Sequence, residues 1–138
     1  MLTIPFRLSR AEYQRRPYAY LVIEVNGLIG MDEDGLVLQY REKTTQPQKW
    51  ALPPTETDVQ VVHIPLAALR RVVVRGRWFG VKLVLAAADL RAFEPFRAWL
   101  TPNGELRLTI PRAERAAAAD LASSIELALS TRLLSHGG

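Results

Sequence analysis

The stretch ELRLTIPRAERAAAADLASSIELALSTRLL, residues 105–134, decides the fold of this chain. Glu105 to Ile110 alternate polar and apolar side chains, which is typical of a strand with one buried face. Pro111 follows, and proline suits the first helical position because the N–H that it lacks would have no partner there. The Ala- and Leu-rich sequence beyond it predicts one long helix over about 111–134.

This helix is expected to pack one face on a sheet, because its apolar residues recur at spacings of three and four. Charged residues such as Arg115 and Glu126 avoid that face. The predicted buried stripe consists of Ala118, Leu121, Ile125, Ala128 and Leu129.

Upstream of the helix, short apolar stretches are spaced like strands and predict an antiparallel sheet. Tyr18 to Val25 alternates sides, and Asn26-Gly27 forms either a tight turn or a bulge in a strand that continues to Met31. The bulge is favoured, because a turn there would leave a very short second strand. Asp32 to Gly35 is the firmer turn. Further strands are predicted at residues 36–41, 59–64, 70–75, 80–85 and 105–110.

Two segments depart from this pattern. Ser9-Arg10-Ala11-Glu12 has the spacing of a capping box, in which serine and glutamate side chains satisfy the free N–H groups of a first helical turn. A short helical segment is therefore expected over about 9–16, ended by Pro17. Residues 42–58 carry three prolines and many polar groups. They predict a long loop, which Trp50 could anchor.

Length and composition set the outer bounds. The 138 residues fit one compact domain. The absence of cysteine removes disulfides and thiolate chemistry, and it fits the cytoplasm. No apolar stretch approaches the ~20 residues of a membrane-spanning helix, so no integral membrane segment is expected. The Arg-rich N-terminus lacks the pattern of a signal peptide. A net charge of +4 does not by itself indicate nucleic acid.

Three segments together are similar to a known family. They are Gly30 to Leu38, Ile64-Pro65-Leu66 followed by Leu69 to Val72, and Leu106 to Ile110 running into the C-terminal helix. Over nearly everything after Tyr18, the chain resembles bacterial pleckstrin-homology-like (PH-like) domains. The resemblance implies a mainly β (α+β) fold, a partly open barrel of about seven antiparallel strands in two nearly orthogonal sheets, capped by the C-terminal helix.

The same resemblance implies a non-catalytic module that binds lipid headgroups, peptides or its own copies. Phosphoinositide-binding members carry Lys and Arg around the first hairpin. The hairpin taken here as its match is Asp32-Glu33-Asp34, which would repel a phosphate. No ligand residue is therefore carried over from the family.

No motif of a catalytic, metal or cofactor site stands in the sequence. His63 and His136 are its imidazole bases, and no G-x-S-x-G elbow is present. Asp32-Glu33-Asp34 lacks the alternating ligands and closing Glu of a calcium loop. Gly76 to Gly80 lacks the G-x-G-x-x-G spacing of a nucleotide-phosphate loop. We therefore expect a protein that is not an enzyme, with no catalytic residues, no metal and no cofactor.

The best functional candidate is a hairpin that combines basic and aromatic residues. Arg71 and Arg75 share one face of a strand, and Lys82 can lie across from Arg75. Such a surface could dock on an acidic peptide, an anionic membrane surface or single-stranded nucleic acid. Alternatively, it is a solvated sheet face with Trp78 in the core or in a dimer contact. The candidate binding surface consists of Arg70, Arg71, Arg75, Arg77, Trp78, Phe79 and Lys82.

The leading hypothesis is a cytoplasmic, non-catalytic binding or assembly module, with a protein partner or self-association favoured. A second hypothesis is a small-molecule carrier or enzyme with a site in the barrel mouth, lined by Tyr20, Tyr40 and Trp50. A third is binding of nucleic acid or an anionic lipid surface through the hairpin from Arg70 to Lys82.

Overall fold

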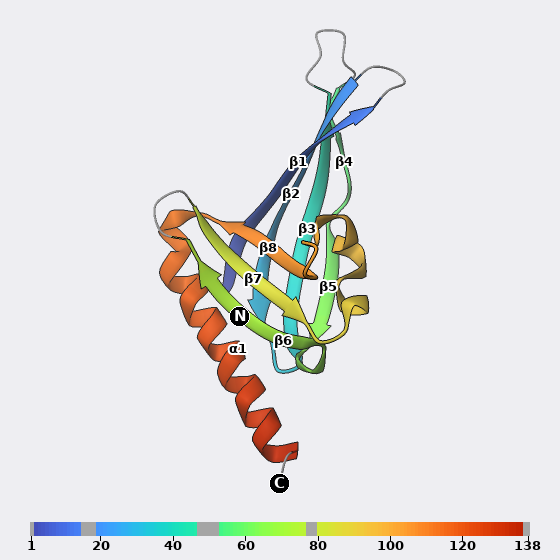
Figure 1. The fold of residues 1–138 in the computed structure, drawn as a ribbon. Coiled ribbons are helices and arrows are strands. Elements are labelled where there is room, and N and C mark those ends of the chain that lie inside the picture. The colour runs from blue at the N-terminus through green and yellow to red at the C-terminus, as the bar shows by residue number, and fades with distance from the viewer. Residues whose placement is uncertain (1, 15–18, 47–52, 77–79, 137–138) are drawn as a thin grey trace.

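The computed structural model describes residues 2–14, 19–46, 53–76 and 80–136. They form one antiparallel sheet, three 3₁₀ helices and one α-helix (Figure 1). The strands are β1 (Thr3–Gln14), β2 (Ala19–Met31), β3 (Gly35–Thr45), β4 (Thr55–Glu56), β5 (Gln60–Pro65), β6 (Leu69–Arg75), β7 (Val81–Ala87) and β8 (Glu105–Ile110). The helices are η1 (Leu66–Ala68), η2 (Leu90–Trp99), η3 (Arg112–Glu114) and α1 (Arg115–His136).

The strand order makes the sheet a partly open barrel. It runs β4-β3-β2-β1-β8-β7-β6, and β5 pairs with the first part of β3. β1 and β8 are in register at a single pair, Arg7 with Thr109. In Figure 1 the strands on the two sides of this joint cross at a steep angle. Together with the C-terminal helix, this arrangement confirms the predicted fold class.

One open side of the barrel is filled by η2. This helix contacts β5, β7 and β8, and its Phe93 and Phe96 enter the core with at most 1% of their surface exposed. Asp89 caps it, because the Arg91 backbone N–H donates to the Asp89 carboxylate (3.0 Å). This hydrogen bond is the main cause that lowers the pKa of Asp89. Asp89 therefore fixes the start of the helix that carries both aromatic rings.

The C-terminal helix α1 fills the other side, mainly against β6. Ala118, Leu121 and Ile125 are buried in the core, as predicted, whereas Ala128 and Leu129 are half-buried. The α-helix begins at Arg115, after one turn of η3, and not directly at Pro111. In the part of the chain that the structure describes, no helix combines the length and apolar character needed to cross a bilayer.

A side chain of α1 also completes the hydrogen bonding of β6, the last strand in the order. The Val72 backbone N–H donates to Glu126 Oε1 at 2.8 Å. An N–H at the outer edge of a sheet has no strand partner, and leaving it unpaired in a half-buried place is costly. Glu126 is therefore the acceptor that ties the helix to the sheet edge.

The predicted N-terminal helix over 9–16 is wrong, because β1 continues as a strand to Gln14. β1 pairs with β2 in one unbroken register that ends where Gln14 meets Ala19. The Arg10 guanidinium lies 4.9 Å from the ring centroid of Trp99 and donates to the Ala98 carbonyl. A capping box satisfies only the first N–H groups of one turn, whereas the ladder pairs a whole strand, so the long-range pairing prevails.

The predicted loop over 42–58 contains more strand than expected. β3 continues to Thr45, where β4 pairs Thr55 with Thr44 and Glu56 with Lys43. This part of β3 is half-buried and extends past the core, so its polar residues have no apolar face to bury. Residues 47–52, Trp50 among them, lie outside the described part of the chain.

The strand through Asn26-Gly27 continues to Met31 as predicted, but its register has no bulge. A Cβ on Gly27 would lie 2.3 Å from the Gln39 carbonyl oxygen, so glycine here permits a close approach of two strands. The turn at Asp32 to Gly35 is confirmed, because Asp32 Oδ1 accepts the turn's backbone N–H groups at 2.9 and 3.0 Å. It joins β2 to β3 and is therefore the second hairpin, not the first.

Glu126→Ala is expected to lower the free energy of unfolding by about 1–3 kcal/mol, because the Val72 N–H loses its acceptor. Glu126→Gln keeps an oxygen acceptor at the same position and is the matched control, with a smaller loss. Urea unfolding followed by circular dichroism measures both variants. Equal stability of the two variants would show that this hydrogen bond does not hold α1 on β6.

Candidate functional site

The described residues of the predicted binding surface lie on β6 and β7. Arg70, Arg71, Arg75 and Lys82 are all exposed. Arg77, Trp78 and Phe79 lie outside the described residues. Arg70 falls at an irregularity of the β6–β7 pairing and has no partner in its register. The candidate site therefore consists of Arg71, Arg75 and Lys82, together with the residues that neighbouring strands place beside them.

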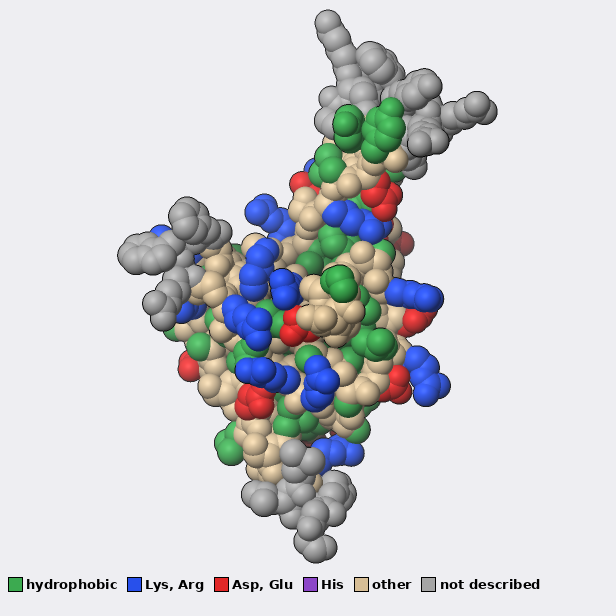
Figure 2. Space-filling view, viewed as in Figure 1, with side chains coloured by type: hydrophobic (Ala, Val, Ile, Leu, Met, Phe, Trp, Pro, Cys, Tyr) green, Lys and Arg blue, Asp and Glu red, His purple; other side chains and the backbone are tan. Residues whose placement is uncertain are grey.

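The register of β6, β7 and β8 gathers basic side chains on the outer face of the sheet. Arg75 lies opposite Lys82, as predicted, and Val84 lies between Val73 on β6 and Arg107 on β8. Figure 2 shows Lys and Arg side chains collected on the side of the molecule that carries these strands. We call Arg71, Arg75, Lys82 and Arg107 the cationic face.

Val84 belongs to this outer face, yet it is only 2% exposed. Its neighbours in sequence, Leu83 and Leu85, point into the core. Arginine and lysine side chains can lay their apolar stems over such a residue while their charged heads stay in water. The cationic face therefore has a closely packed apolar layer beneath its charged groups.

Cross-strand pairing extends this basic surface from β6 across β7, β8, β1 and β2 to β3. Successive cross-strand partners form one row of exposed or half-exposed polar residues, and none of them is acidic. At ~4.8 Å between strands, six positions span ~24 Å along the curved sheet. We call it the cationic row: Arg75, Lys82, Thr109, Arg7, Asn26 and Arg41.

Sequence reasoning missed Arg7, Arg41 and Arg107 as members of this surface. They stand far from Arg75 and Lys82 along the chain, and only the register of β1, β3 and β8 brings them together. Strand alternation from Thr3 to Gln14 was the signal that could have found Arg7. From Ser9 to Glu12 the spacing of a capping box competes with that signal.

Few carboxylates neutralise the cationic face. Arg107 pairs with Glu105 at 3.2 Å. Among the residues that the structure describes, Arg71, Arg75 and Lys82 have no ion pair. The Lys82 ammonium donates instead to the Thr109 hydroxyl. Within the described chain, Arg107 is thus the one member of the cationic face with an acidic partner.

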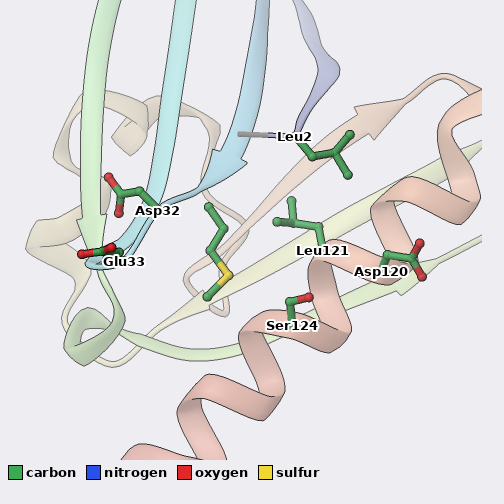
Figure 3. Close-up of a pocket in the computed structure, with 7 residues that line it drawn as sticks. Leu2, Asp32, Glu33, Asp120, Leu121 and Ser124 are labelled. Atoms are coloured by element: carbon green, nitrogen blue, oxygen red, sulfur yellow. The ribbon is translucent and has the colours of Figure 1, made fainter.

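A pocket of about 470 Å³ carries the opposite charge (Figure 3). It lies between α1, the start of the chain and the β2–β3 turn, and Leu2, Met31 and Leu121 give it an apolar lining. Figure 3 shows Asp32 and Glu33 on one side of Leu121 and Asp120 on the other. We call Asp32, Glu33, Asp34 and Asp120 the acidic end.

The acidic end is likewise without counter-charge in the described part of the chain. No ion pair there involves any of its carboxylates. Among the described residues, no group of three or more His, Cys, Asp and Glu side chains could hold a metal ion. The Asp32 carboxylate is already engaged with the backbone of its own turn. The pocket therefore combines carboxylates that have no ion pair with an apolar lining.

Comparison with protein-family models, with curated proteins and with solved structures finds no match to this chain. The resemblance to PH-like domains therefore stays a prediction.

The barrel interior gives the second functional hypothesis little support. Its described lining is aliphatic and aromatic, and the core holds no buried charged side chain. Tyr20 is 56% exposed on the projecting part of β2, whereas Tyr40 is 6% exposed and packs against Phe96. The two tyrosines therefore do not line a common mouth, and Trp50 lies outside the described residues.

Tyr40 behaves as a structural residue. Its hydroxyl donates to Gln60 Oε1 at 3.0 Å. Burial, and secondarily the charge of Glu42, raises the pKa of Tyr40, so the hydroxyl keeps its proton at neutral pH. His63, the imidazole in a described strand, is exposed on β5. His63 lines a hollow of about 240 Å³ together with Asp32 and Asp34 of the β2–β3 turn.

Tyr40→Phe is expected to lower the free energy of unfolding by about 0.5–1.5 kcal/mol, because one partly buried hydrogen bond to Gln60 is lost while the ring stays packed. Thermal and urea unfolding measure the change, and Tyr13→Phe on the exposed end of β1 is the control. If the variant is as stable as the wild type, the Tyr40 hydroxyl does not contribute to holding β5 in place.

Proposed function

We propose that this chain is a non-catalytic assembly module whose copies associate head to tail, with the cationic face of one copy on the acidic end of the next. The observation that carries the proposal is the presence of two oppositely charged surfaces. Within the described chain, most basic groups of the cationic face and all carboxylates of the acidic end have no ion pair. The PH-like identity belongs to the same proposal, and the strand order with its C-terminal helix supports it.

The positions of the two surfaces favour an open contact between copies. In Figure 1 the β2–β3 turn lies at the lower end of the view, whereas β6 ends and β7 begins at the upper left. When two different surfaces of one chain meet, each added copy leaves one surface of each kind exposed. Growth into a ring or a filament follows from this geometry.

Apolar residues accompany the charges on both surfaces. Leu2 is 64% exposed beside the acidic end, and Val73 is half-buried within the cationic face. Complementary charge steers and orients the encounter, while contact of apolar atoms adds to affinity. A protein partner is therefore favoured over a purely ionic one.

The described part of the cationic face exposes no large apolar or aromatic side chain, and Trp78 and Phe79 lie outside the described residues. Single-stranded nucleic acid stacks its bases on exposed aromatic rings, and peripheral membrane proteins insert apolar side chains. The large exposed apolar residues of the described chain lie elsewhere, on β1, β2, β5, α1 and the adjoining segments. They are Leu2, Tyr13, Tyr20, Leu28, Val59, Val61, Leu90 and Leu127.

Sedimentation velocity tests the assembly. At low ionic strength the wild-type chain is expected to form species heavier than one chain, and their share should fall as NaCl is added, because salt screens exposed charges. Two neutralised variants give a sharper result. The face variant carries Arg75→Gln and Lys82→Gln, and the end variant carries Glu33→Gln and Asp120→Asn. Each variant alone is expected to sediment as a single chain.

Mixing the two variants in equal amounts should restore a complex of two chains and none larger, because only one intact face and one intact end can meet. A control with Arg91→Gln and Arg97→Gln loses the same charge from η2 and should associate like the wild type. A wild-type chain that stays single at every salt concentration would contradict the proposal. So would a cationic face that binds an oligothymidylate or phosphatidylserine vesicles but no second copy.

A further inference from the structure

A hollow of about 480 Å³ opens at the joint between β1 and β8. Phe6 and Ile110, which are at most 3% exposed, form an apolar inner wall. Arg7 and Asn26, both exposed, stand at its mouth as part of the cationic row. No acidic residue lines it: the lining is Pro5, Phe6, Arg7, Asn26, Thr109, Ile110 and Pro111.

Two prolines explain why this space exists. Antiparallel register continued from the pair Arg7 and Thr109 would place Pro5 opposite Pro111. Neither proline has an N–H group, so neither can donate a ladder hydrogen bond. Beyond this pair, on the side of Pro5 and Pro111, the ladder between β1 and β8 does not continue, and the space there stays open.

Hydrogen-bond donors surround the mouth of the hollow. The Arg7 guanidinium offers a fork of N–H groups, and the Asn26 amide offers two more donors. Thr109 Oγ1 accepts from Lys82 Nζ, which leaves the threonine hydroxyl hydrogen to donate elsewhere. It also keeps the Lys82 ammonium beside the hollow. An apolar wall strengthens such interactions by excluding water.

We propose that this hollow is an oxyanion site and that, in the assembly, a carboxylate from the acidic end of a second copy occupies it. The second clause rests on the proposed function. A fork of N–H groups matches the two oxygens of a carboxylate, and charge-assisted hydrogen bonds of this kind are about twice as strong as neutral ones.

The acidic end fits the hollow in more than charge. Its carboxylates flank apolar Leu2 and Leu121 on two sides, and the donors of the hollow likewise lie beside apolar Phe6 and Ile110. An acid group carried beside an apolar side chain satisfies both parts of the hollow at once. A free phosphate would satisfy the donors alone, so the second copy is the occupant that the surfaces favour.

The first experiment tests the oxyanion site without assembly. Inorganic phosphate is titrated into the end variant, which keeps Lys82, into the same variant carrying Arg7→Gln, and into the same variant carrying Arg41→Gln. Arg41 lies in the cationic row but does not line the hollow, so its loss is the matched control. Saturable shifts of the Arg7, Asn26 and Thr109 amide resonances are expected, and only Arg7→Gln should abolish them. Shifts that fail to saturate, or that are equal in both, would overturn the site.

The second experiment tests the occupant. Arg7→Gln and Thr109→Val in the otherwise wild-type chain should each weaken head-to-tail association about tenfold, the effect of ~1.4 kcal/mol from one charge-assisted contact. Arg41→Gln should change it little, and phosphate should compete with association. Equal weakening by Arg7→Gln and Arg41→Gln would overturn the carboxylate contact yet leave assembly intact. A saturable phosphate site in a chain that never associates would support the site and refute the assembly.

Discussion

The pairing of Arg7 with Thr109 is the constraint on which the rest of the molecule depends. β1 and β8 are the middle strands of the sheet, with β2 to β5 on one side and β7 and β6 on the other. A long ladder between them would hold both groups in one gently twisted sheet. Because β1 and β8 are in register at only one pair, the two groups of strands can turn steeply and face each other across a shared core. The helices η2 and α1 then fill the openings that this turn creates.

The same pairing organises the outer surface. Side chains alternate faces along each strand, so any register that buries Phe6 and Leu108 also exposes Arg7 and Thr109. Each exposed ion pair on its own contributes ~0–1 kcal/mol, which is too little to stabilise a fold. A row of uncompensated charges acts differently, because it sets how fast and in which orientation a partner arrives. The cationic row therefore adds little to the stability of the fold, and the proposed function assigns it a part in recognition.

Local patterns predicted those parts of the molecule in which the local signal and the tertiary structure agree. The stripe from Ala118 to Ile125, the turn at Asp32 to Gly35 and the pairing of Arg75 with Lys82 follow from spacing along the chain. The strand from Ser9 to Gln14 did not, since a capping box competes there with a ladder that only the fold supplies. The cationic row depends on five strand pairings, and no local pattern contains it.

The tie between Glu126 and Val72 has a meaning beyond stability. An open barrel ends in two strands whose outer backbone groups are natural templates for fibrous aggregation. Here α1 occupies the edge of β6, and η2 contacts β5 at the other margin. Pairing with a strand of another molecule is therefore hindered at β6 and at β5. In the proposed assembly, contacts between copies would then be made by side chains, which can form and break reversibly without any rearrangement of the backbone.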